Sequence, residues 1–488
     1  MVARSILREM GMSALLLKTA EMMKCRTAYA ERQGPVIRVF SPSIAESDHF
    51  YDQLEAWRYE DAMNPHKRAL DRIALSAEQI KRKMKDLVFS WSPGSGRMVG
   101  YHADPELDEH FLFAMNESTL GWRNLAGLHP HTELLGVSGA LISGIVSLLG
   151  SFYLKHINFV AVGLETLEKI NVPMSLTIWE TRAELLESLA AFTGEDINSL
   201  STVLDRIIVS PGNVRFFASA QTPYVPMLIR VSDEQLLRPV SSIFSNPIRG
   251  IRALLEFESP ELEATIRKPR ERWMKDELDA MFSGNRYRVV SQPVVLKHSG
   301  VALTDIDAAV LDTTCGCLAL FQLKWQDFGT TDVRRQRSQA RNFTTSVDEW
   351  SKRVKTWIGN YGITELARSL QLPAKISSFR MFAIGRQSAH FSSIGYVSSD
   401  TDLAFSTWPQ FVRLRFQVGP VEHVLDKLHA ALLNERDTAV KVTVIPHEIT
   451  VGDQRILFQN YWYGFDEEEI GSGVPDRGYF DAESKSTS

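Results

Sequence analysis

The sequence predicts an α/β protein with several domains, and three observations lead to this fold class. The chain has 488 residues, which is more than one hydrophobic core usually organises. Up to about residue 205, apolar residues recur mostly with the period of an α-helix. After residue 259, helical and strand-like patterns follow in the order αβββαβ, which is typical of an α/β domain.

These changes of pattern predict four regions along the chain. They are a mainly helical domain at 1–255, an α/β domain at 256–400, an α/β extension at 401–465 and an acidic, disordered tail at 466–488. Apolar residues make up 44% of the chain and charged residues 23%, which excludes a largely disordered or collagen-like protein. Its 3 cysteines are too few for a disulfide framework or a four-thiolate zinc site.

We expect a cytoplasmic protein, because charged residues interrupt the apolar pattern of the first 25 residues and no secretory signal is evident. One segment argues the other way, since residues 134–154 carry no charge and are long enough to span a bilayer. Gly and Ser are frequent in this segment, which suits close packing between helices. We expect a buried helix here and no membrane partner; the alternative is a membrane-associated protein anchored through 134–154.

Within the N-terminal region, strand-like pieces at 35–40 and 86–91 interrupt the helical pattern. Residues 92–98 contain a Gly-x-Gly pair without the following Lys and Ser or Thr of a phosphate loop, so we expect a turn. Residues 211–250 contain five prolines, which interrupt regular secondary structure, so we expect an irregular connector there.

The remaining elements follow from periodicity and turn residues. We expect helices at 259–282, 332–357 and 420–434, and strands at 286–297, 302–312, 317–325, 376–385, 411–418 and 439–445. The segment Thr-Thr-Cys-Gly at 313–316 separates two apolar runs and predicts a hairpin. Cys315 and Cys317 lie at this turn, and we expect no metal-binding role for them.

The hairpin fixes an expected register for polar side chains inside apolar strands. If Asp312 faces Cys317, then Asp307 faces Gln322 and Asp305 faces Lys324. Directly opposed residues project from the same face, so these polar groups should converge. Isolated charges are costly among apolar neighbours unless they are paired or bind a metal. A buried Asp–Lys ion pair beside a hydrogen-bonded glutamine is an equally acceptable interpretation of these residue types, and one β-bulge would shift the register.

This arrangement resembles the PD-(D/E)XK nuclease superfamily, in particular the Mrr-type restriction branch in which glutamine replaces the usual acid. The resemblance covers residues 259–390 and is carried by GVALTDIDAAV, LALFQLKW and the flanking elements. It implies a restriction-endonuclease-like fold, with Asp307 as the metal-binding aspartate, Gln322 in the place of the acid, and Lys324 as the conserved lysine of the motif. The family often adds a helix glutamate, for which we expect Glu271.

Glu271 shares a predicted helix face with Met274 and Leu278, and Glu277 is the alternative. Asp305 is a second-choice residue for the site. The resemblance implies Mg²⁺ or Mn²⁺ held by Asp307, Gln322 and the glutamate, which suits the preference of Mg²⁺ for oxygen ligands. Because an amide offers one neutral oxygen, metal binding should be weaker than in the acid form.

Charge is unevenly distributed along the chain. Residues 259–388 hold 20 Lys or Arg against 14 Asp or Glu, a net charge of +6, whereas the whole chain has −5. Basic side chains gather in the helix after the motif, and four of them are our candidates for contacts with phosphate groups: Arg334, Arg335, Arg337 and Arg341. The alternative for such a run is a solvated helix face. Trp350 and Trp357 on this helix are more consistent with core packing than with base stacking.

Together, the motif and the resemblance lead us to expect a metal-dependent endonuclease acting on nucleic acid, with double-stranded DNA favoured over RNA. By family analogy alone, a role in bacterial antiviral defence is possible, with the N-terminal domain as a sensor, partner-binding module or site of homo-oligomerisation. The competing hypothesis is a non-catalytic nucleic-acid-binding or scaffold protein that retains a nuclease-like fold.

Overall fold

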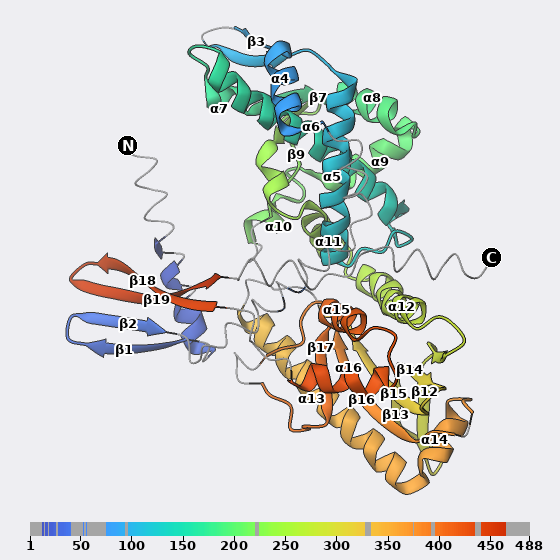
Figure 1. Ribbon diagram of the computed structural model, residues 1–488. Helices are drawn as coiled ribbons and strands as arrows, with labels where there is room; N and C mark the ends of the chain where they lie inside the picture. Colours follow the sequence, from blue (N-terminus) through green and yellow to red (C-terminus); the bar gives the residue numbers. More distant parts are fainter. Residues whose placement is uncertain are drawn as a thin grey trace. The chain divides into compact units, whose positions relative to one another are not determined.

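The computed structural model describes residues 12–13, 15–17, 19–25, 28–40, 52, 55, 75–92, 96–219, 224–326, 333–373, 375–391, 396–434 and 441–464. It is a mixed α/β structure with several small sheets (Figure 1). The chain divides into two compact units, one of residues 64–270 and one that joins residues 1–63 to residues 271–488. This division differs from the expected boundary near 255, because it places the first 63 residues with the C-terminal part.

The unit of residues 64–270 is mainly helical, as expected. Its helices are α4 (Ala77–Leu87), α5 (Pro105–Ala126), α6 (Gly139–Thr166), α7 (Val172–Ser175), α8 (Arg182–Thr193), α9 (Ile197–Ile207), α10 (Val214–Ser219), η1 (Val240–Phe244) and α11 (Pro247–Glu258). Two short hairpins accompany them, β3 (Val88–Trp91) with β4 (Met98–Tyr101) and β5 (Glu133–Leu134) with β6 (Val137–Ser138).

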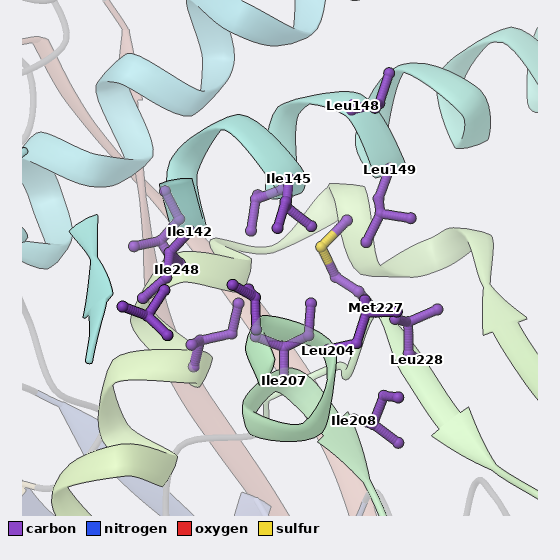
Figure 2. Close-up of a cluster of buried hydrophobic side chains, with 14 of the residues drawn as sticks. Ile142, Ile145, Leu148, Leu149, Leu204, Ile207, Ile208, Met227, Leu228 and Ile248 are labelled. Carbon is purple, nitrogen blue, oxygen red and sulfur yellow. The ribbon is translucent and has the colours of Figure 1, made fainter. Parts of the chain in front are cut away.

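Helix α6 contains most of the uncharged segment 134–154 and forms the centre of the core of this unit. Ile145, Val146 and Leu149 are fully buried, and Figure 2 shows side chains of α6 facing residues from α9, β8, β9 and α11. By length and composition α6 is the one described helix that could span a membrane, and 67% of its most apolar window is buried within the unit.

Residues 211–250 are more than the connector that the prolines predict. They contain β9 (Leu228–Arg230) and β10 (Gln235–Pro239), which join β7 (Thr177–Thr181) and β8 (Ile208–Val209) in a sheet of order β7-β10-β9-β8. The expectation was wrong because proline is tolerated at strand and helix ends, where Pro239 and Pro247 lie. Pro239 ends β10 and Pro247 opens α11, where a missing N–H does not break a hydrogen-bond ladder.

The unit that contains residues 271–488 is built around a five-stranded sheet of order β11-β14-β15-β16-β17. Its strands are β11 (Tyr287–Val290), β14 (Ala308–Asp312), β15 (Cys317–Lys324), β16 (Ser378–Gly385) and β17 (Leu403–Thr407). The first two neighbouring pairs are antiparallel, and β15, β16 and β17 run parallel. The central strands β14 and β15 are buried along nearly their whole length, as expected from their apolar residues.

Helices cover both faces of this sheet. On one face, α12 (Leu262–Met281), α15 (Trp408–Val418) and α16 (Val424–Asn434) pack against Val310, Phe321 and Phe382. On the other, α13 (Val333–Tyr361) and α14 (Ile363–Ser369) pack against Leu311 and Leu320. The predicted strand at 411–418 is wrong, because this segment belongs to α15. Its alternating pattern is overridden by helix signals, with Thr407 as N-cap and proline in the first turn.

The predicted strands at 286–297 and 302–312 are each interrupted. The first divides into β11 and β12 (Val294–His298), and the second into β13 (Val301–Ile306) and β14. Strands β12 and β13 form a separate two-stranded hairpin. Both ends of the chain contribute to a further sheet, of order β1-β2-β19-β18, with β1 (Tyr29–Gln33), β2 (Val36–Phe40), β18 (Lys441–Val451) and β19 (Gln454–Gly464). The expected tail at 466–488 lies outside the described residues.

Candidate functional site

The predicted register of the 304–327 hairpin is correct from its turn as far as Ala308. Asp312 pairs with Cys317 and Ala308 pairs with Phe321. The backbone N–H of Asp307 donates to the carbonyl of Phe321 at 3.2 Å and not to that of Gln322, so the pairing shifts by one residue at Asp307. Asp307 lies at the bend between β13 and β14, immediately before the strand that enters the five-stranded sheet.

The Asp307 carboxylate and the Gln322 amide meet directly. Oδ2 of Asp307 accepts a hydrogen bond from Gln322 Nε2 and another from the backbone N–H of Leu323, the latter at 2.8 Å. Gln322 is 3% exposed, whereas Asp307 is half-buried. Within the described parts of the chain, Oδ1 of Asp307 accepts no hydrogen bond. One carboxylate oxygen is thus held by the protein, and the other is available to a ligand.

Burial raises the pKa of the Asp307 carboxyl above its ordinary value, and this is the largest of the effects on it. The Leu323 N–H and the positive charges of Lys324 and Lys275 act in the opposite direction, while the negative charge of Asp305 raises the pKa further. Coulombic effects of this kind fall with distance, so two lysines and a second aspartate lie within electrostatic reach of Asp307.

Lys324 ends β15 and is half-buried. Its backbone carbonyl accepts a hydrogen bond from the N–H of Arg386 at 2.9 Å, which fixes the end of β15 against the end of β16. Among the residues described, the Lys324 ammonium makes no hydrogen bond or ion pair. The alternative of a directly bonded buried Asp–Lys ion pair is therefore not what this structure contains, although the two charges influence each other.

Asp305 does not face Lys324, so the predicted register fails at this residue. It pairs instead with Val295 in the β12–β13 hairpin, and its side chain is exposed. The chain bends at Asp307, which ends the β14–β15 ladder before Asp305 is reached. The backbone carbonyl of Asp305 accepts a hydrogen bond from Trp350 Nε1 at 2.7 Å, so helix α13 fixes the strand next to the bend.

On helix α12, Glu277 is committed to another partner. Its carboxylate binds the guanidinium of Arg386 through both terminal nitrogens, with Nη2 to Oε1 at 3.1 Å. Arg386 is 4% exposed and lies 5.3–5.6 Å from the ring centres of Trp273, Trp325 and Trp408. Sequence analysis did not identify Arg386, because nothing in its local sequence indicates that it follows a strand end beside Lys324.

Lys275 lies on the flank of the buried stripe of α12 opposite to Glu277, whereas Glu271 lies in line with the stripe, which contains Met274 and Leu278. Trp273 contacts Trp325, and Glu277 pairs with Arg386. The side of α12 that carries Trp273 and Glu277 therefore faces the ends of β15 and β16. In the sheet order, β14 is the neighbour of β15 opposite to β16. The flank with Lys275 is therefore the one toward β14, and the charge of Lys275 acts on the Asp307 carboxyl at the start of that strand. Glu271 itself is exposed.

No group of three or more His, Cys, Asp or Glu side chains is arranged to hold a metal ion in the described parts of the chain. The oxygen donors near the bend are the free carboxylate oxygen of Asp307, the exposed carboxylate of Asp305 and the amide of Gln322. Mg²⁺ is commonly held by one or two carboxylates, waters and substrate phosphate, and these donors fit such a sparse site. They do not fit a closed cage built from protein ligands alone.

Some of the basic side chains of α13 already form contacts within the protein. Arg334 pairs with Glu21, and Arg337 donates to the carbonyl of Cys25 at 2.6 Å and to the hydroxyl of Tyr396 at 3.2 Å. Arg341 is exposed and has no partner among the described residues, whereas the Arg335 side chain lies outside them. Of the four predicted phosphate contacts, Arg341 is thus the one with a described side chain and no competing contact.

Comparisons with known proteins do not add to this geometry. No protein-family model matches the chain, and neither the curated proteins nor the solved structures contain a significant match.

Proposed function

We propose that this protein is a metal-dependent nuclease that hydrolyses phosphodiester bonds, with DNA as the favoured substrate. The observation that carries the proposal is the meeting of Asp307, Gln322 and Lys324 where β14 begins and β15 ends. Three polar residue types that a core does not need lie together there, and both the Lys324 ammonium and Oδ1 of Asp307 lack partners among the described residues.

In this proposal Asp307 holds Mg²⁺ or Mn²⁺ through its free oxygen, and Asp305 or Gln322 supplies a further oxygen. A bound Mg²⁺ would neutralise charge on the phosphate and lower the pKa of a coordinated water. Gln322 and the Leu323 N–H orient the Asp307 carboxylate by binding its other oxygen. Lys324 supplies a fixed positive charge for the phosphate oxygens as negative charge develops on them.

The α12 glutamate most consistent with the proposal is Glu271, because Glu277 is bound to Arg386. Glu271 lies in line with the buried face of α12 and its side chain is exposed, so in this proposal its carboxylate would supply a further oxygen ligand to the metal. Removing the Glu271 carboxylate should therefore lower the affinity of the site for the metal less than removing the Asp307 carboxylate does.

A cleavage assay on supercoiled plasmid and on structured RNA, with Mg²⁺ or Mn²⁺, tests the proposal. Asp307→Asn and Lys324→Ala should each lower the rate of cleavage by about 100-fold or more, the scale for groups that stabilise transition-state charge. Asp233→Asn, in an exposed turn of the other unit, and Lys427→Ala, on α16, are matched controls that should leave the rate unchanged. Equal rates for all four variants and the wild type would show that the activity comes from another site.

A further inference from the structure

We propose that Lys275 is a phosphate-binding residue of the candidate site, which it completes together with Lys324. This inference rests on the proposed function and adds a residue that the sequence motif does not contain. The ligand class is a phosphodiester group of nucleic acid, bound through its non-bridging oxygens by two lysines that come from different elements.

The placement of Lys275 follows from how α12 is fixed over the sheet. Trp273 packs on Trp325 with ring centres 5.8 Å apart, and Glu277 binds Arg386. These contacts orient one side of the helix toward the ends of β15 and β16. Lys275 projects from the opposite side of the buried stripe, toward β14 and the bend at Asp307. The effect of its charge on the Asp307 carboxyl agrees with that placement.

Lys275 and Lys324 approach the bend from the two faces of the sheet. Lys324 alternates along β15 with Gln322 and Leu320, and Leu320 packs on the face covered by α13. Lys275 belongs to α12, which covers the other face. A phosphate group at the open edge between β14 and β15 would thus meet one ammonium group from each side.

The state of the Lys275 side chain points to an anionic ligand. It is half-buried, yet it makes no hydrogen bond or ion pair with any residue in the described part of the chain. Glu271 lies one helical turn before it, in the order that favours an i,i+4 pair, but no such pair forms. The ammonium group of Lys275 is therefore available for charge-assisted hydrogen bonds to the oxygens of a phosphate.

Nucleic-acid binding by the full chain, measured without divalent metal so that cleavage cannot interfere, tests the inference. Fluorescence anisotropy with a labelled duplex and a labelled single strand should be recorded over a range of salt concentrations. Lys275→Ala should weaken duplex binding by about tenfold and reduce the slope of log K against log salt by about 0.9, the value for one phosphate contact. Lys275→Arg should retain most of the slope.

Lys427→Ala is the matched control, because it removes an exposed lysine from another helix of the same unit. Thermal denaturation of each variant shows whether it is folded. If Lys275→Ala is destabilised, Lys275→Gln replaces it, because glutamine keeps most of the aliphatic stem without the charge. If the wild type binds and Lys275 variants bind as tightly as Lys427→Ala, the inference is wrong while the proposed function stands. If the wild type binds neither strand form, the proposed function fails and the inference fails with it.

Discussion

Removing the charge of Glu277 should destabilise the five-stranded unit, because it takes away the bidentate ion pair that Glu277 forms with the buried Arg386 guanidinium. Arg386 is 4% exposed, whereas the Glu277 side chain keeps 27% exposure. Breaking a fully buried ion pair by removing one partner costs about 3–5 kcal/mol. Glu277 is partly hydrated and Glu277→Gln keeps one acceptor, so we expect the lower end, about 2–3 kcal/mol.

The same structure predicts that removing both charges costs much less than the two single changes together. The three indoles around Arg386 form an apolar surround that can accept a methionine side chain. Replacing a buried pair by apolar groups of similar volume is often neutral or stabilising. Glu277→Leu combined with Arg386→Met should therefore be within about 1–2 kcal/mol of the wild type, which is less than the sum of the costs of Glu277→Leu alone and Arg386→Met alone.

Hydrogen exchange of the β16 backbone amides is the appropriate measurement, because it reports opening of the unit that contains the pair. A chain with two compact units need not unfold in one step, so a single global transition would not isolate the effect. The exposed pair Glu349–Arg353 on α13 is the control, and Glu349→Gln should cost at most about 0.5 kcal/mol. If Glu277→Gln costs no more than this control, Arg386 does not depend on its counter-ion.

Three further predictions follow from single residues. In Asp307→Asn, the amide oxygen can accept both hydrogen bonds that Oδ2 of Asp307 accepts. Because burial raises the pKa of the Asp307 carboxyl, the wild type should lose stability relative to this variant as the pH rises above the ordinary pKa of 3.8. Thermal denaturation of both proteins in EDTA over a range of pH measures this difference. Phe321→Ala removes a fully buried ring 5.1 Å from that of Phe382, so hydrogen exchange of the β15 and β16 amides should show a loss of about 3–5 kcal/mol. Thr407→Ala removes the N-cap of α15, and exchange of the first α15 amides should report a loss of about 1 kcal/mol.

Short-range patterns predicted the central part of the fold well. The hairpin turn at 313–316 fixed the pairing of Asp312 with Cys317, and simple counting then placed Asp307 beside Gln322. The burial of Val310 and Phe321 followed from their apolar neighbours. These predictions succeeded because pairing next to a tight turn leaves little freedom of register.

Other features depend on contacts that periodicity does not encode. The segment 411–418 alternates like a strand, but the cap at Thr407 and the buried spacing of Phe411, Leu414 and Arg415 make it helical. The partner of Glu277 could not be predicted, because Arg386 follows a parallel strand more than a hundred residues later in the sequence. Such contacts are set by the order of strands in the sheet, which local patterns leave open.

The bend at Asp307 explains both the success and the failure of the predicted register, and it gives the candidate site its form. If the strand continued straight, Asp305 would face Lys324 and the two charges would neutralise each other inside the sheet. Because β13 instead turns away to pair with β12, Asp305 remains exposed and Lys324 remains without a partner among the described residues. A break in pairing costs hydrogen bonds that a purely structural hairpin would keep. Here it leaves one carboxylate oxygen and one ammonium group available at the same sheet edge, which a phosphodiesterase site requires and a stable core does not.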